Sequence, residues 1–474
     1  MATINTSAKP SAHSDPWRPN YHLTASQGLI NDPNGFSFHN GRFQLFYQWN
    51  PFGCDHKNKH WGHFSSSDLV HWDSHQVALA PGDWFDKDGC YSGTAAIEDE
   101  SLCLYYTGNV REGERRLSYQ CKAVQQADGS FKKLGPLNLP KLNGYTGHVR
   151  DPKLLRWQDQ TWIILGAQTT NLEGGICLLQ KQQEQWVKKG FISKDISLGK
   201  AQTAYMWECP DLFELDQQWL LLACPQGVSV EQAEYTNQNL SGYFCADMQQ
   251  GPAHFKITSE FQLLDHGFEF YAPQVLQHQG ESTLIAWLGL PDNFAHPTVD
   301  YQWTQILSMP RRLSWKDGVL QQLPAEQLTT LMHAPQLTQY IAGKHQLEHL
   351  SNSCVIDLEL SSVSKLQLLI ANGDDNLNIQ WLNNELQIDR TNLGPKGADT
   401  LRRYQPRDGS LRQLLLFIDH SSFELFVNHG ETVMSGRIFP NEAWNRVQFN
   451  LFDGQATLQT SQMLSSDDKE GNDE

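Results

Sequence analysis

The feature that most constrains the fold of this chain is a repeat of about 60 residues. Five similar segments follow one another, each with a polar turn and then a short apolar stretch, and their first residues are Asn31, Ser92, Arg150, Glu208 and Tyr271. These openings are 61, 58, 58 and 63 residues apart. A repeat of this length suits a four-stranded sheet with its turns, and such sheets arranged around one axis form a β-propeller. The period therefore predicts five blades.

Each opening is expected to lie on the innermost strand of its blade. The apolar stretches that follow the openings indicate a further strand in each blade, and they cover residues 43–48, 102–107, 161–167, 219–225 and 283–288. Equivalent positions in successive blades are related by rotation about the central axis. Side chains at the five openings should therefore converge on one central pocket.

Three acidic residues lie at or next to these openings. Asp32 and Asp151 each precede a proline, and Glu208 lies two residues before Pro210. Asp-Pro is a common turn dipeptide, so one such motif alone indicates only a turn. Three of them in equivalent positions predict three carboxyl groups around one small volume, where like charges raise the pKa of at least one group. Packing does not need this arrangement, which therefore indicates a reaction site.

The sequence after the repeats changes character. It contains short strand-like runs separated by turns such as Asn428-His429-Gly430, a pattern typical of an antiparallel β-sandwich. We therefore expect an all-β chain in five parts. These are a flexible N-terminus at 1–19, a five-bladed β-propeller at 20–325, a linker at 326–344, a β-sandwich at 345–464 and a disordered acidic tail at 465–474.

Composition narrows the set of partners and the compartment. The formal net charge is −17, from 36 Lys and Arg against 53 Asp and Glu, and so acidic a chain is a poor non-specific binder of nucleic acid or anionic membrane. The nine cysteines are odd in number and show no Cys-x-x-Cys spacing, which argues against a disulfide framework and a zinc ribbon. Neither a signal-peptide core nor an apolar run of membrane-spanning length is present. These features predict a cytoplasmic protein.

Two further signals favour structural roles. His56, His60 and His63 have the spacing of one helical face, which would suit a metal site, but the surrounding Gly and Pro residues indicate loop and strand instead. No metal site is therefore expected. Cys209 follows Glu208 directly, but no Cys-His pairing is evident, so it is expected to pack rather than to act as a nucleophile.

Further motifs occur in a fixed order along the repeats. They are Phe-Tyr-Gln-Trp-Asn-Pro at residues 46–51, Trp61-Gly62-His63, Asp83-Trp84-Phe85-Asp86, and the segments that begin at Tyr91 and Tyr271. With the three acidic motifs, this ordered set resembles the invertase and fructanase family of glycoside hydrolases, and most of all its bacterial sucrose-6-phosphate hydrolases and intracellular invertases. The resemblance covers roughly the first 330 residues. The chain departs from the family pattern at Ile30, at Tyr91, where Phe is usual, and at residues 308–311.

The resemblance implies a five-bladed β-propeller followed by a β-sandwich, and hydrolysis of a β-fructofuranosyl bond with retention of configuration, without metal or cofactor. By the matching motifs Asp32 is the nucleophile, Glu208 the general acid and base, and Asp151 the stabiliser of the transition state. The expected substrate-binding residues are Asn31, Gln48, Trp61, Tyr91, Ser92, Arg150, Tyr271 and Trp287, the last because it lies on the strand after the Tyr271 motif. Arg150 is also expected to keep Asp151 ionised.

The expected partners are small sugars, namely sucrose, sucrose 6-phosphate and short fructo-oligosaccharides, and a homo-oligomer stays open. Three other functions also stay open. An inverting propeller glycosidase would need its acid and base farther apart, and the full motif at residues 31–35 argues against it. A non-catalytic sugar-binding propeller would not need all three acids. A fructan hydrolase or a fructosyltransferase would differ only in chain length or in the acceptor.

Overall fold

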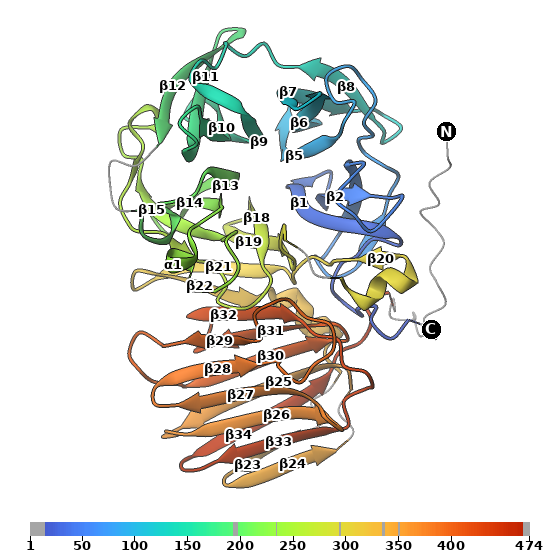
Figure 1. The fold of residues 1–474 in the computed structure, drawn as a ribbon, viewed down its shortest axis with the longest axis vertical. Coiled ribbons are helices and arrows are strands. Elements are labelled where there is room, and N and C mark those ends of the chain that lie inside the picture. The colour runs from blue at the N-terminus through green and yellow to red at the C-terminus, as the bar shows by residue number, and fades with distance from the viewer. Residues whose placement is uncertain are drawn as a thin grey trace.

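The computed structural model of this chain describes residues 15–192, 198–233, 235–292, 295–333, 337–348 and 351–467. A ring of five sheets stands on a pair of larger sheets (Figure 1). The predicted fold class is therefore confirmed. Within the described ranges, no helix is both long and apolar enough to cross a membrane. Most of the predicted N-terminal and C-terminal tails, residues 1–14 and 468–474, lie outside the described residues.

The five sheets of the ring are antiparallel and take their strands almost in chain order. The first two contain β1 (Gly28–His39), β2 (Arg42–Asn50), β3 (His60–Ser66) and β4 (Trp72–Ser74), then β5 (Cys90–Glu98), β6 (Ser101–Glu112), β7 (Arg115–Gln125) and β8 (Phe131–Pro136). The third contains β9 (Tyr145–Trp157), β10 (Gln160–Thr169), β11 (Gly174–Gln182) and β12 (Gln185–Ile192). The last two contain β13 (Met206–Leu215), β14 (Gln218–Gln226), β15 (Gly242–Asp247), β16 (Lys256–Ile257) and β17 (Gln262–Leu263), then β18 (Tyr271–His278), β19 (Glu281–Trp287), β21 (Arg311–Lys316) and β22 (Val319–Pro324). The apolar stretches predicted after the openings fall on the second strands β2, β6, β10, β14 and β19.

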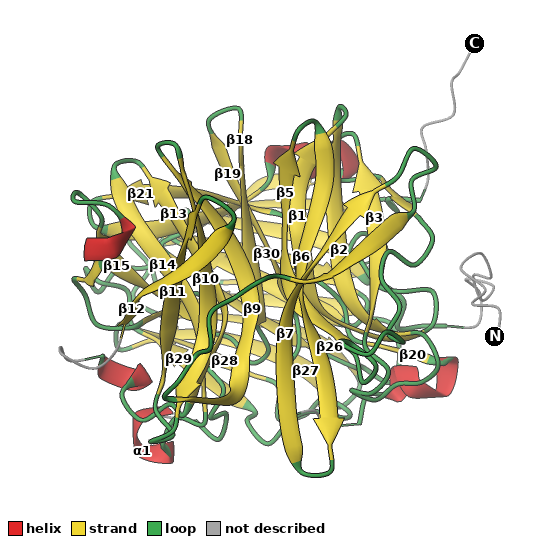
Figure 2. Cartoon of the chain, turned by 90° about the horizontal axis from the view of Figure 1, so that it is seen from above, coloured by secondary structure: helices red, strands yellow, loops and turns green. Residues whose placement is uncertain are grey.

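The innermost strands are β1, β5, β9, β13 and β18, and each contacts the innermost strands of the neighbouring blades (Figures 1 and 2). In every blade the pairing of this strand with the next shifts by one residue at the motif. Such a β-bulge bends the strand and re-aims its side chains. At three of the bulges a residue before proline has positive φ, of 60° at Asp151, 47° at Cys209 and 49° at Ala272. The five repeats therefore share one local device for turning side chains toward the axis.

A strand from the end of the repeats closes the ring. Strand β20 (Trp303–Thr304) pairs in parallel with the start of β1, in the first sheet. The indole N–H of Trp303 donates to Asp15 Oδ2 at 2.6 Å, and Asp15 is buried. The prediction of a flexible N-terminus is therefore wrong for residues 15–19, because a buried carboxylate fastens them to the ring. No periodic pattern marks this anchor in the sequence.

The C-terminal part consists of two six-stranded antiparallel sheets. One has the order β23 (Leu337–Ile341), β34 (Gln455–Gln462), β25 (Ser353–Ser361), β30 (Gln413–Asp419), β31 (Ser422–Val427) and β32 (Thr432–Arg437). The other has the order β24 (Lys344–Glu348), β33 (Arg446–Leu451), β26 (Leu366–Asn372), β27 (Asp375–Leu382), β28 (Glu385–Asp389) and β29 (Leu401–Tyr404). Burial alternates along β33, as expected for a sheet with one face on a core. Part of the predicted linker at 326–344 is instead the edge strand β23.

The remaining elements are short helices at the ends of strands. They are η1 (Gly199–Ala201), α1 (Val230–Ala233), η2 (Pro252–His254), η3 (Pro297–Tyr301) and η4 (Glu326–Leu331).

Buried charges join the two parts of the molecule. Arg311, the first residue of β21, bonds Glu424 on β31 at 2.6 Å and Asp265 at 3.0 Å. Arg390, which follows β28, bonds Glu269 beside β18 at 2.6 Å. Removing one member of such a buried pair is strongly destabilising, since the other charge is left without compensation. These pairs fix the sandwich against the last blade.

Candidate active site

A cavity of about 320 Å³ lies where the innermost strands of the five blades meet. All three predicted acids line it. So do seven of the eight predicted binding residues, which are Asn31, Gln48, Tyr91, Ser92, Arg150, Tyr271 and Trp287. The rotational symmetry of the repeat thus brings together residues that are up to 256 positions apart in the chain.

Asp32 lies on β1 and receives two hydrogen bonds from neighbouring side chains. Asn31 Nδ2 donates to Oδ1 at 2.8 Å, and Ser92 Oγ donates to Oδ2 at 2.5 Å. Removal from bulk water raises the pKa of Asp32, while these donors and the charge of Lys59 act in the opposite direction. The carboxylate is held in one orientation, with its position fixed from two blades.

Glu208 lies on β13 and is bonded through both oxygens. Arg150 donates to Oε1 from Nε at 3.0 Å and from Nη2 at 2.7 Å, and the Tyr271 hydroxyl donates to Oε2 at 2.8 Å. The expectation that Arg150 serves Asp151 is therefore wrong in its main partner. The bulge turns the guanidinium toward Glu208, and Asp151 lies at 4.0 Å.

Asp151 lies in the bulge of β9 and is buried. Its own N–H donates to Thr107 Oγ1 at 3.0 Å, and its Oδ2 accepts the backbone N–H of Cys209 at 3.0 Å. Burial, with the nearby charges of Glu208 and Asp32, raises the pKa of Asp151 to about 7 against the lowering effect of Arg150. Cys209 packs beneath the acids, as its Sγ is 3.8 Å from Asp151 Oδ2 and 3.9 Å from Asp32 Oδ2.

Trp61 is the predicted binding residue that the cavity does not include. It is fully buried between the first two blades, with Phe46 and Tyr106 as aromatic neighbours, and its indole N–H donates to Tyr91 O at 3.1 Å. The reason is its place on β3, the third strand from the axis. It supports the strand that carries Tyr91 and Ser92 instead of contacting a ligand.

Sequence reasoning missed a lysine beside the first acid. Lys59 is 7% exposed, and its Nζ donates to Asn31 Oδ1 at 2.5 Å and to His56 Nδ1 at 3.1 Å. Burial lowers the pKa of Lys59 to about 8, although Asp32 and Asp55 favour its charge. Because an ammonium group only donates, it fixes the Asn31 amide with its oxygen toward Lys59 and its NH₂ toward Asp32. Lys59 lies in a loop outside any repeat motif, so no pattern identifies it.

A second group of missed residues lies on the opposite side of Glu208. Arg150 Nη1 donates to His148 Nδ1 at 2.9 Å, and Arg116 Nη1 donates to the same atom at 3.4 Å. Gln226 and Pro291 complete the lining. The cavity of this acidic chain therefore contains several basic side chains, and the sequence gave no sign of their grouping because they come from different blades.

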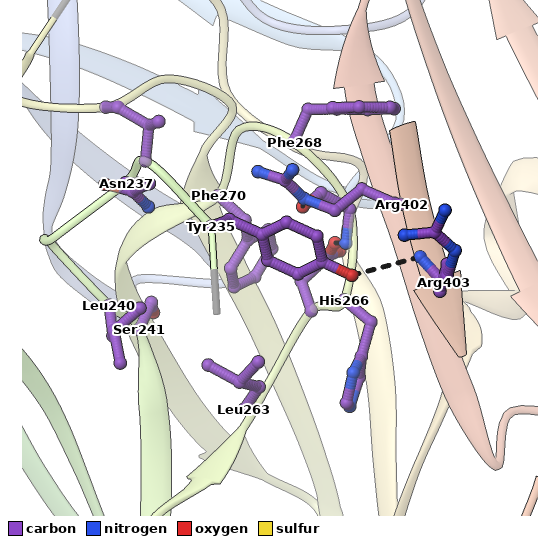
Figure 3. A pocket seen from close by; sticks show the side chains of 13 residues that line it. Tyr235, Asn237, Leu240, Ser241, Leu263, His266, Phe268, Phe270, Arg402 and Arg403 are labelled. Carbon is purple, nitrogen blue, oxygen red and sulfur yellow. Dashed lines mark hydrogen bonds between the residues drawn. The ribbon is translucent and has the colours of Figure 1, made fainter. Parts of the chain in front are cut away.

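A smaller cavity, of about 50 Å³, lies between the fourth blade and the sandwich (Figure 3). There the backbone N–H of Arg403 donates to the Tyr235 hydroxyl at 3.1 Å, and the Arg402 guanidinium stacks on the Tyr235 ring at 3.9 Å. The same guanidinium lies 4.9 Å from the ring of Phe268. These contacts make this region a joint between the two parts of the molecule.

Comparison with known proteins agrees with this geometry. Residues 22–324 match the model described as glycosyl hydrolases family 32 N-terminal domain, and residues 326–465 match the family 32 C-terminal model. The chain is 40% identical over 448 residues to a sucrose-6-phosphate hydrolase of Klebsiella pneumoniae, covering 91% of each.

Two solved structures are similar over nearly their whole length. A sucrose-6-phosphate hydrolase from Lactobacillus gasseri has a TM-score of 0.86 and 31% identity, with coverage of 96% of this chain and 95% of that one. A mutant β-fructofuranosidase of Bombyx mori in complex with sucrose has a TM-score of 0.82 and 28% identity, with 95% of each chain covered.

Proposed function

The chain belongs to glycosyl hydrolase family 32, and on this premise we propose that it is a retaining β-fructofuranosidase that hydrolyses sucrose and sucrose 6-phosphate to release fructose. The observation that supports this best is the placement of three carboxyl groups, from three different blades, around one cavity. Glycosidic cleavage needs one acid to protonate the leaving oxygen and one carboxylate to meet the developing oxocarbenium ion.

In this mechanism Asp32 attacks the anomeric carbon of the fructosyl unit. The hydrogen bonds from Asn31 and Ser92 hold its carboxylate in place before attack, so little reorientation is needed on the way to the transition state. A covalent fructosyl ester forms on Asp32, and water then hydrolyses it from the same face. Two inversions give net retention of configuration.

Glu208 moves the proton in both steps. Arg150 donates two hydrogen bonds to Oε1 and has no lone pair to offer, so the proton resides on Oε2. The Tyr271 hydroxyl beside Oε2 can accept or donate as that proton leaves and returns. Glu208 therefore gives its proton to the leaving oxygen, and it takes one from water after Asp32 has been esterified.

Asp151 takes the third role, binding the fructosyl hydroxyls so that they stabilise the positive charge on the ring. Its Oδ2 is occupied by the Cys209 N–H, which leaves Oδ1 for the sugar. Gln48, Tyr91 and Trp287 are proposed to contact the sugar from the cavity wall.

Turnover and stereochemistry test this function. The purified protein should hydrolyse sucrose and sucrose 6-phosphate faster than raffinose or inulin, and NMR should detect β-fructofuranose as the first anomer released. Release of the α-anomer would assign an inverting mechanism. Preference for inulin, or net transfer to a sugar acceptor, would favour a fructan hydrolase or a fructosyltransferase.

A cytoplasmic location is part of the proposal. All nine cysteines have free thiols in the structure, five of them within the propeller core and one in the sandwich core. A chain with many thiols and no disulfide is typical of a reducing compartment. The enzyme would then encounter sucrose inside the cell.

A further inference from the structure

Arg116 differs from the other cations around the cavity in its partners. It lies near the start of β7, at the hairpin that joins β6 to β7, and it is half-buried. Its guanidinium carbon is 5.5 Å from the centre of the Tyr91 ring, and Nη1 is 3.4 Å from His148 Nδ1. Within the described ranges, no carboxylate oxygen lies within 4 Å of it, whereas Arg150 is paired with Glu208. Burial lowers the pKa of Arg116, a cost that a bound anion would offset.

The position of Arg116 relative to the acids assigns it to the leaving-group side. A chain of contacts runs from Glu208 to Arg150 at 2.7 Å, from Arg150 to His148 at 2.9 Å, and from His148 to Arg116 at 3.4 Å. Glu208 is the group proposed to protonate the leaving oxygen, so the departing glucosyl unit must lie beside it. Arg116 is then within reach of that unit and away from the fructosyl side, where Lys59 and Asn31 bond each other.

His148 offers a second donor at the same place. Both arginines donate to its Nδ1, which must therefore carry the lone pair, so the proton of the neutral ring is on Nε2. Burial, with Arg150 and Arg116 nearby, lowers the pKa of His148 to about 4 and keeps the ring neutral at physiological pH. A neutral imidazole N–H next to an arginine can bind an oxyanion in the way a phosphate requires.

The space next to these two residues is large enough for a bulky leaving group. A groove of about 910 Å³ adjoins the cavity between the second and third blades, and Arg116 and His148 line both. Arg115 and Lys141 also line the groove. The groove is thus locally basic on a chain whose formal net charge is −17.

We infer that Arg116 and His148 form a subsite for the phosphate of a hexose phosphate leaving group. The inference rests on the proposed function and assigns its preference for the phosphorylated substrate to two residues. A phosphate monoester carries two negative charges near neutral pH, and the planar guanidinium can bind two of its oxygens at once. The free sugar would use the same cavity without this contact.

The test compares two substrates in matched variants. In the unmodified enzyme, kcat/KM should be higher for sucrose 6-phosphate than for sucrose. Arg116→Met should reduce the ratio of these two values about 10- to 100-fold, the effect of losing hydrogen bonds to a charged group, through a higher KM for the phosphate ester. Arg116→Lys should retain part of the preference. Arg156→Met is the control, because Arg156 is exposed on β9, lines neither space, and removes the same charge.

A binding measurement separates this inference from the proposed function. Calorimetry with glucose 6-phosphate needs no turnover, and we expect binding to weaken in Arg116→Met and to persist in Arg156→Met. Equal binding by Arg116→Met and the unmodified protein, or a substrate ratio unchanged by Arg116→Met, would overturn the subsite while hydrolysis of sucrose still supported the proposed function. If neither sucrose nor its phosphate is hydrolysed, the proposed function is wrong, whatever the binding result.

Discussion

At the scale of single residues, three carboxyl groups in one cavity have three different sets of donors. Asp32 is held by an amide and a hydroxyl, Glu208 by a guanidinium and a phenol, and Asp151 by a backbone N–H. Environments that separate the properties of neighbouring acids are what acid–base and nucleophilic roles require. The proposed division of work follows from these contacts.

The first prediction separates the nucleophile from the acid. Asp32→Ala and Glu208→Ala should each lower kcat on sucrose by about 10²–10⁴-fold or more while the protein stays folded, because neither side chain is part of a hydrophobic core. A substrate with a good leaving group needs less protonation, so it should partly rescue Glu208→Ala and not Asp32→Ala. Steady-state kinetics with a nitrophenyl fructoside provides the measurement. Equal rescue of both variants would contradict the assignment of roles.

The second prediction concerns Lys59, which orients Asn31 toward Asp32. Lys59→Met should lower kcat/KM on sucrose about 10- to 100-fold, because the Asn31 amide loses the charged donor that fixes its direction. The melting temperature should not fall, because burial opposes the charged form of this lysine. Lys57→Met is the matched control, since Lys57 is exposed and pairs with Asp55 at the surface. Equal loss of activity in both variants would contradict a positioning role.

At the scale of the elements, the β-bulge of each innermost strand determines which side chains enter the cavity. A regular strand alternates its side chains, whereas the extra residue changes the face presented by the residues that follow. The same scale includes the segment before β1. There Asn20, Tyr21 and His22 donate backbone N–H groups to Asp419 at the end of β30. His22 is inserted between Asp419 and Glu424, at 2.9 and 3.0 Å.

The third prediction follows from this histidine. Only the protonated ring donates at both nitrogens, and the hydrogen bonds to Asp419 and Glu424 raise the pKa of His22 against the effect of burial. A pKa raised by folding adds stability below the unfolded value, about 6.5, that is lost as pH rises through the folded value. The folded pKa values of Asp419 and Glu424 are lowered, so their contribution is lost only as pH falls well into the acid range.

His22→Gln should therefore cost more stability at pH 6 than at pH 9. Denaturant unfolding of the two proteins at both pH values measures the difference in the free energy of unfolding. A difference that does not change with pH would show that the histidine is not protonated in the folded protein.

At the scale of the whole molecule, the propeller and the sandwich behave as one body because charged groups are buried between them. The fourth prediction is that calorimetry shows a single unfolding transition and that Arg311→Met lowers stability by about 3–5 kcal/mol, since Asp265 and Glu424 are left without their cation. The neighbouring Arg312→Met should cost less than about 1 kcal/mol, because its pair with Glu326 is partly exposed. Two separate transitions in the unmodified protein would contradict this coupling.

The repeat in the sequence by itself determined the five blades, the strand order within them and the meeting of Asp32, Asp151 and Glu208. A fixed period is a property of the chain, and rotation about one axis converts it into convergence in space. The strand-like runs after the repeats likewise predicted the sandwich.

Tertiary structure alone decided the partners of these acids. Arg150 bonds Glu208 rather than its neighbour Asp151, because a bulge changes the direction of the side chain. Lys59, Arg116 and His148 reach the cavity from loops and strand ends that no periodicity marks, and Trp61 is buried because it lies on the third strand. Contacts between blades depend on packing across the ring, and a single sequence read along its length contains no measure of that distance.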